Sequence, residues 1–92
     1  ALLGLGDDGH IASIFPWSTE VWSSSKVVVT ESPIEPKFRI SLGPRYLLKS
    51  EMILVIGYGE NKIKIAREAF EEINDIESMP CRLVLHGQWI LA

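Results

Sequence analysis

The sequence predicts an α/β fold in which a mostly parallel sheet is flanked by helices. Two apolar runs, residues 1–5 and 52–56, each lead into a glycine-rich turn, and a stretch with helical periodicity follows the second turn. An unbroken apolar run of this length is typical of a parallel strand that is covered on both faces. Strands that alternate with helices in this way indicate one α/β domain.

The length and composition fit a part of such a domain. The chain has 92 residues, of which 47% are hydrophobic, and this is enough for one small core. It starts without methionine and already inside an apolar run, and a parallel strand needs neighbours to cover it. We therefore expect residues 1–92 to be the carboxyl-terminal part of a single, longer α/β domain.

The first glycine-rich turn carries the strongest functional signal. It reads Gly4-Leu5-Gly6-Asp7-Asp8-Gly9-His10 and follows the first predicted strand. In open α/β sheets, ligands bind at the carboxyl ends of the strands, which is where this turn would lie. The carboxylate of Asp8 can orient the imidazole of His10, a side chain that exchanges protons near neutral pH. The pair is a candidate acid–base device, although such a pair also fits a helix-capping Asp beside a His that only packs.

The same glycines spell a dinucleotide-binding pattern, Gly4-x-Gly6-x-x-Gly9. Glu31 stands about where that motif places the acid that binds the ribose. However, Asp7 and Asp8 would put negative charge against a pyrophosphate, and Pro16 stops the helix that the motif requires. We therefore disfavour a nicotinamide cofactor.

Residues 11–25 read as a short helix followed by a loop. Apolar side chains at 11, 12, 14 and 15 favour one or two helical turns, which Pro16 ends. Residues 17–25 contain four serines and two tryptophans. We expect Trp17 and Trp22 to anchor this loop to the protein, since large aromatic side chains usually bury their rings.

Two strands are expected on either side of a linker that contains prolines. Residues 26–30 are rich in valine and typical of a buried strand, whereas residues 32–37 contain two prolines and are not expected to be helical. Residues 38–42 alternate apolar and polar side chains, which predicts that Arg39 is presented on a polar face. An arginine fork suits a phosphate group, so Arg39 is a candidate substrate-binding residue, and the alternative is a solvated strand face.

The second half of the chain predicts the longest helix and a second candidate cation. Residues 57–59 form the second glycine turn, and Asn61 is the expected N-cap of the helix that follows. Lys62 lies in the first turn, where the helix dipole disfavours a cation. A residue placed against its local preference suggests that it binds an anion. The apolar side chains recur at helical spacing and comprise Ile63, Ile65, Ala66, Ala69, Phe70 and Ile73.

Two shorter elements complete the prediction. Gly43-Pro44 begins a short helix, because proline fits the first helical turn. Residues 82–85 and 88–91 read as two strands of a hairpin. His86 would lie at the tip of this hairpin, and we expect it to be solvated and without a chemical role.

Charge and composition argue against several classes of partner. The net charge is −3 and the basic residues form no stripe, which argues against a nucleic acid. No apolar run approaches the roughly eighteen residues of a membrane span, so no membrane partner is expected. Cys81 is the single cysteine, which excludes an internal disulfide and favours a reducing, cytoplasmic setting. No cluster of cysteine and histidine has the spacing of a zinc site.

Residues 2–16 read Leu-Leu-Gly-Leu-Gly-Asp-Asp-Gly-His-Ile-Ala-Ser-Ile-Phe-Pro, and this string resembles the signature of 6-phosphogluconolactonases. That family shares a superfamily with glucosamine-6-phosphate isomerases/deaminases. Residues 38–42, 52–62 and 88–91 also look like the family, in its order, so the resemblance spans nearly the whole chain. It implies a Rossmann-like α/β fold and the hydrolysis of 6-phosphogluconolactone to 6-phosphogluconate, a cytoplasmic reaction of the pentose phosphate pathway that needs no cofactor.

The resemblance also implies a site. His10 and Asp8 would be catalytic, with neutral His10 taking a proton from the water that attacks the lactone carbonyl. The residues expected to bind the sugar-phosphate lactone are Gly6, Gly9, Arg39 and Lys62. Further acidic and basic site residues would come from sequence outside this chain, so the chain by itself is expected to hold only part of the site.

One position separates the two enzyme classes of the superfamily. Deaminases carry a glutamate five residues after the histidine, and this chain has Phe15 there, which cannot transfer a proton. Residues 41–45 and 59–62, in contrast, are nearer to the deaminase spelling. A deaminase-like enzyme and a non-catalytic sugar-phosphate-binding protein are therefore the alternatives.

Overall fold

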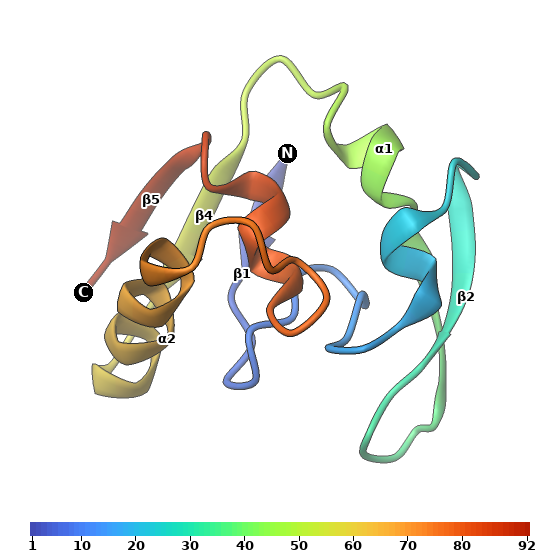
Figure 1. Ribbon diagram of the computed structural model, residues 1–92, viewed down its shortest axis with the longest axis horizontal. Coiled ribbons are helices and arrows are strands. Elements are labelled where there is room, and N and C mark those ends of the chain that lie inside the picture. Colours follow the sequence, from blue (N-terminus) through green and yellow to red (C-terminus); the bar gives the residue numbers. More distant parts are fainter.

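The computed structural model describes residues 1–92, and its elements form two regions that lie side by side (Figure 1). A three-stranded parallel sheet with its helices makes one region, and a two-stranded antiparallel ribbon makes the other. In chain order, with η for a 3₁₀ helix, the elements are β1 (Leu2–Gly4), η1 (Thr19–Trp22), β2 (Val27–Glu31), β3 (Phe38–Leu42), α1 (Pro44–Leu47), β4 (Leu54–Gly57), α2 (Glu60–Glu71), η2 (Pro80–Val84) and β5 (Gln88–Leu91).

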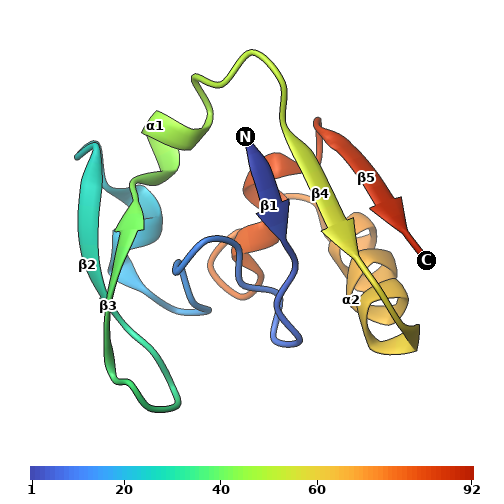
Figure 2. The same ribbon diagram turned by 180° about the vertical axis from the view of Figure 1, so that it is seen from behind.

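The parallel sheet has the strand order β1-β4-β5, so β4 is its central strand. This confirms the predicted α/β fold and the parallel strands. Leu3, Val55 and Trp89 are paired across the three strands and point to the face that α2 and η2 cover. Figure 2 shows the opposite face, which carries no helix. There Leu2 is 68% exposed, so the expectation that these strands are covered on both faces is wrong for this chain.

Helix α2 packs on the sheet through its small side chains. Ala66 and Ala69 are buried, whereas Phe70 is 51% exposed, so only one edge of the predicted apolar set faces the core. The predicted N-cap is wrong: the helix begins directly after Gly59, which has a φ of 102° and provides no side-chain cap. Glycine adopts this positive φ without strain, and the chain therefore enters the helix before Asn61.

The carboxyl-terminal hairpin is also a wrong prediction. Residues 80–84 form η2, and only β5 is a strand, which pairs in parallel with β4. Pro80 begins η2, as proline suits a first helical turn. The buried guanidinium of Arg82 then donates hydrogen bonds to the carbonyl oxygens of Glu68 (2.9 Å), Ala69 (3.1 Å) and Asp75 (2.8 Å). The carbonyls of Glu68 and Ala69 lie in the last turn of α2, where helix carbonyls lack backbone partners, and an Arg82 in an extended strand could not satisfy them together.

The ribbon has the predicted strands but the opposite orientation. The apolar face of β3 points to solvent, where Phe38 is 67% and Ile40 is 75% exposed. Arg39 and the buried Ser41 face inward, and Ser41 Oγ accepts a hydrogen bond from the Ser13 N–H at 3.1 Å. Arg39 is half-buried and lines a cavity, so it is presented as predicted, but on the face of β3 that packs over the loop that follows β1. Strand β2 is likewise buried on one face only, with Val29 63% exposed.

The segment that joins the two regions is a tight turn, not the predicted short helix. Ile11 and Ile14 form an antiparallel bridge and are fully buried, while Ala12 has a φ of 50°. Trp17 and Trp22 are 69% and 57% exposed, so neither tryptophan anchors the following loop. Its anchors are buried Val21 in η1 and the hydrogen bond from the Trp17 N–H to the Glu77 carbonyl at 2.7 Å.

One hydrophobic core connects the two regions. It runs from Ala66 of α2 through Val55 and Ile11 to Leu47 of α1. The loop between β2 and β3 is not helical, as expected, and the Ser32 N–H closes it by a 2.6 Å hydrogen bond to the Lys37 carbonyl. The structure contains no helix with the length and apolar character that crossing a bilayer requires.

Candidate active site

The loop after β1 holds His10 at the carboxyl end of the sheet. The Gly6 N–H donates to the His10 carbonyl at 2.9 Å, and the Gly9 N–H donates to the Gly6 carbonyl at 3.0 Å. Gly9 has a φ of 88°, which glycine adopts at no steric cost. These bonds close the chain on itself and turn the imidazole toward the sheet edge.

Gly6 leaves the space that the imidazole occupies. A Cβ at this position would overlap Nδ1 and Cε1 of the His10 ring, so any other residue would displace it. Gly9 is similarly confined, because a Cβ there would lie 3.0 Å from Cγ of Met79. The N–H groups of both glycines are already used inside the turn, so they are not free donors for a substrate. Their predicted contact with substrate stays a prediction.

Asp8 and His10 form the pair that the sequence indicates. Asp8 Oδ1 lies 2.5 Å from Nδ1 of His10 and also accepts the His10 backbone N–H at 3.1 Å. The side chains are 39% and 31% exposed, so the pair is within reach of solvent. Because a carboxylate only accepts hydrogen bonds, Nδ1 carries the proton and Nε2 is left to accept one. The interpretation that Asp8 merely caps a helix is wrong, since no helix follows it.

Phe15 and Arg39 complete one side of the imidazole. The Phe15 and His10 rings lie 4.6 Å apart between centroids at an interplanar angle of 44°. The Arg39 guanidinium lies 5.8 Å from the centre of the Phe15 ring, and its Nε donates to the Pro36 carbonyl at 2.7 Å. These side chains border a cavity of about 280 Å³ whose lining includes Asp7, Asp8, His10, Phe15, Ser32, Pro33, Ile34 and Arg39.

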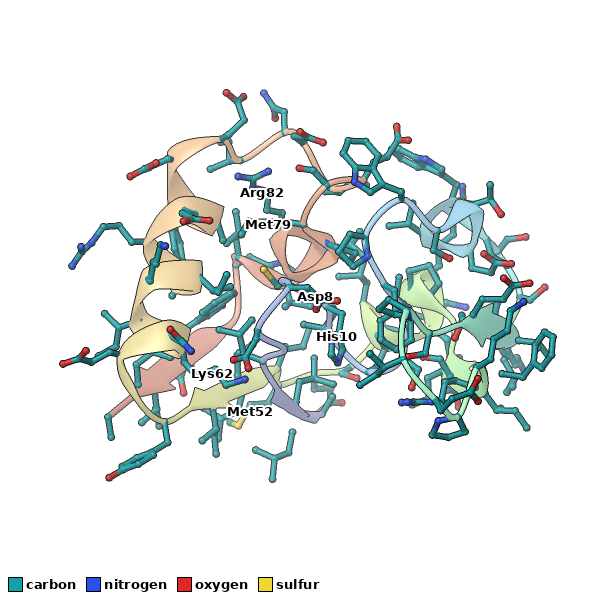
Figure 3. All side chains as sticks on the ribbon, turned by 90° about the horizontal axis from the view of Figure 1, so that it is seen from below. Asp8, His10, Met52, Lys62, Met79 and Arg82 are labelled. Atoms are coloured by element: carbon teal, nitrogen blue, oxygen red, sulfur yellow. The ribbon has the colours of Figure 1, made fainter.

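Lys62 lies on the other side of His10. Its Nζ is 2.8 Å from Oδ1 of Asp7, and both residues border a second cavity of about 460 Å³ that also touches His10 and β1. Gly57 makes room for the lysine stem, because a Cβ there would lie 2.9 Å from Cβ of Lys62. Figure 3, seen from the carboxyl ends of the strands, shows Asp8, His10 and Lys62 together near the centre.

The structure therefore brings all predicted side chains of the site to one edge of the sheet. Sequence reasoning missed the two contacts that complete it: Asp7 as the partner of Lys62, and the backbone of η2 beneath the turn. The Cys81 N–H donates to the Gly9 carbonyl at 2.9 Å. The sequence holds no signal for that bond, because it joins positions far apart in the chain.

Cys81 itself is not a candidate nucleophile. The side chain is fully buried, and burial raises the pKa of its thiol to about 11. The reactive form of cysteine is the thiolate. Among the His, Cys, Asp and Glu side chains, no group of three or more is placed to hold a metal ion.

The dinucleotide alternative fails on topology. A dinucleotide-binding unit needs its second strand next to the first in one parallel sheet. Glu31 ends β2, which pairs with β3 in the antiparallel ribbon and has no place in the sheet of β1. Asp7 and Asp8 also keep negative charge at the glycine turn.

Comparison with known proteins assigns the chain to a family. Residues 1–91 match the family model of glucosamine-6-phosphate isomerases/6-phosphogluconolactonase. The chain belongs to this family. Within the family, it is 34% identical over 88 residues to a probable 6-phosphogluconolactonase 1 from Oryza sativa subsp. japonica, an alignment that covers 90% of this chain and 30% of the rice protein.

Solved structures of the family have the same fold. A 6-phosphogluconolactonase from Shewanella baltica superposes with a TM-score of 0.84 at 33% identity, over 98% of this chain and 41% of that structure. A monomeric glucosamine-6-phosphate deaminase of the superfamily superposes with a TM-score of 0.69 at 26% identity, over 98% of this chain and 42% of the deaminase. The chain thus spans less than half the length of these family members.

Proposed function

We propose that the protein hydrolyses 6-phosphogluconolactone to 6-phosphogluconate. One observation carries the proposal: in a member of this family, Nδ1 of His10 is held 2.5 Å from Asp8 between two cavities that each contain a cationic side chain. Lactone hydrolysis needs a base beside a site that accepts an anionic sugar, and this arrangement provides both. It is classed by reaction as a carboxylic ester hydrolase.

The proposed chemistry starts at Nε2 of His10. Nε2 takes a proton from a water molecule while the water oxygen bonds to the lactone carbonyl carbon. The tetrahedral intermediate then breaks its bond to the ring oxygen, and the proton on Nε2 passes to that oxygen as the ring opens. The acid product loses its proton to solvent. Asp8 holds the ring in position throughout and stabilises the imidazolium.

The developing negative charge needs hydrogen-bond donors near the carbonyl oxygen. The N–H groups of Asp7 and Asp8 have no acceptor within the chain, in contrast to those of Gly6 and Gly9. They are therefore the donors of the turn that remain for an oxyanion. Lys62 and Arg39, on either side of His10, supply positive charge for the anionic group of the substrate.

Phe15 favours hydrolysis over deamination. It is 5% exposed and its ring lies against His10, at the position where the resemblance places the proton-transferring glutamate of deaminases. A phenyl ring cannot take part in the proton transfers of isomerisation and deamination. The deaminase alternative predicts release of ammonia from glucosamine 6-phosphate, and a sugar-phosphate-binding protein predicts binding without turnover.

The test compares the two histidines of the chain. In the natural protein that carries this sequence, His10→Ala should lower kcat for 6-phosphogluconolactone by about 10²–10⁴-fold, because the general base is removed. His86→Ala is the matched control and should leave kcat unchanged, since His86 is exposed at the amino end of β5. Near-normal turnover by His10→Ala, or ammonia release by the unaltered protein, would contradict the proposal.

A further inference from the structure

An ion pair joins the catalytic turn to the first turn of α2. Lys62 Nζ lies 2.8 Å from Oδ1 of Asp7, and the two side chains differ sharply in exposure, 24% for Lys62 and 71% for Asp7. Both border the cavity of about 460 Å³ beside His10. A substrate anion that reaches Lys62 through this cavity therefore meets a carboxylate already bound there.

The base of the Lys62 side chain is held independently of this carboxylate. Its stem lies against Gly57, where an added Cβ would be 2.9 Å from Cβ and 3.3 Å from Cγ of the lysine. The backbone of α2 holds this same end of the stem, and Asp7 is the partner of the ammonium group at the other end. Asp7, in contrast, is mostly exposed, and an ion pair open to water contributes little to folding. The carboxylate can thus leave the ammonium group while the base of the lysine side chain stays in place.

We propose that Asp7 sets the affinity of the site for phosphate by competing with the substrate for Lys62. This inference rests on the proposed function, in which Lys62 binds the anionic group of the lactone. In the free protein, Asp7 neutralises Lys62. On binding, the phosphate takes the ammonium group and Asp7 turns to solvent. On product release, Asp7 returns to Lys62 and so favours departure of the phosphorylated acid.

The expected effect follows from the charges. Asp7→Asn keeps the shape of the side chain and removes its charge, so a phosphate dianion no longer competes with a carboxylate for Lys62. Breaking one ion pair that is open to water changes a dissociation constant by about two- to fivefold. The Kd of inorganic phosphate should fall by this factor at low ionic strength, and added salt should reduce the difference.

The experiment is a double-mutant cycle read by calorimetry with inorganic phosphate. Asp7→Asn, Lys62→Ala and the double variant are compared in the natural protein that carries this sequence. Asp7→Asn should bind phosphate more tightly, and the double variant should bind it as weakly as Lys62→Ala does, because the competition requires both partners. Glu71→Gln is the matched control: it also removes one exposed carboxylate, at the far end of α2, and should not change Kd.

Enzyme kinetics provide a second measurement. KM for 6-phosphogluconolactone should fall in Asp7→Asn by the same factor as Kd, and the inhibition constant of 6-phosphogluconate should fall with it. KM for gluconolactone without a phosphate should not change. A phosphate Kd that is unchanged or higher in Asp7→Asn overturns the inference, as does a gain in affinity that persists in the double variant.

These outcomes are separable from failure of the proposed function. If the unaltered protein does not hydrolyse the lactone, the proposed reaction is wrong, while the phosphate cycle still decides whether Asp7 competes for Lys62. If hydrolysis requires His10 and the cycle shows no coupling, the reaction stands and the inference about Asp7 falls.

Discussion

One valine of the parallel sheet and one valine of the ribbon differ sharply in burial. Val55 in β4 is fully buried under α2 and η2, whereas Val29 in β2 is 63% exposed. Both strands are rich in β-branched residues. Each region also contributes one cationic side chain to the site, Lys62 from α2 and Arg39 from β3. The difference lies in which face of each strand meets the rest of the chain.

This comparison shows what alternation in a sequence can determine. In β3 it correctly identifies the residues that share a face, since Phe38, Ile40 and Leu42 all point the same way. It does not determine which face packs against the protein. Here the polar face does, because it covers the loop that carries His10, and Ser41 satisfies a backbone N–H of that loop.

The largest expected effect comes from a substitution in the turn between the two regions, which would displace a residue of the site. Gly6→Ala places a Cβ inside the space of the His10 ring and should lower kcat for 6-phosphogluconolactone by about 10²-fold or more, because catalytic geometry tolerates little displacement. Gly4→Ala is the control, since a Cβ there meets nothing within 4 Å. Steady-state kinetics of both variants test this, and equal activities would mean that the turn does not fix the imidazole.

The next effect depends on pH and concerns the region of the parallel sheet alone. Burial raises the pKa of Cys81, beneath the sheet, from 9.0 to about 11. Above pH 9 the thiol ionises in the unfolded chain but stays neutral in the folded protein, which favours unfolding. The contribution of the neutral thiol to the free energy of unfolding is therefore complete below pH 9 and is lost as the pH rises to about 11. The free energy of unfolding should fall by about 2–3 kcal/mol over this range.

Denaturation by urea at several pH values measures this loss, and Cys81→Ala provides the control. The variant should show a flatter decline between pH 9 and pH 11, since the remaining groups titrate in both proteins. A decline of the same depth in Cys81→Ala would assign the alkaline loss to other side chains.

The smallest effect compares one substitution in the two regions. Val55→Ala removes two buried methyl groups and leaves a cavity, so it should lower the free energy of unfolding by about 2 kcal/mol. Val29→Ala makes the same change at an exposed position and should cost less than about 0.5 kcal/mol. Thermal or urea denaturation measures both. Equal losses would show that the outer face of the ribbon is covered in the protein studied.

Local patterns in the sequence predicted the parallel strands β1 and β4 and both glycine turns, and these turns bring His10 and Lys62 to one cavity. These features depend on strand direction and on turn chemistry, which neighbouring residues determine. The failures concern residues whose structure depends on distant partners. Residues 82–85 read as a strand because nothing nearby reveals that Arg82 bonds to the end of α2. The turn at Ala12 was missed because its apolar neighbours fit a helix equally well.

The hydrogen bonds of Arg82 couple the motion of the end of α2 to that of the loop that carries His10. Its guanidinium ties the end of α2 to residues 75–82, and the backbone of that segment bonds to Gly9 on one side of His10 and to Trp17 on the other. The helix end, this segment and the loop that carries the imidazole therefore form one cooperative unit. The amide hydrogens of Trp17 and Cys81 should exchange with solvent deuterium at a common rate, since neither is released until the whole unit opens.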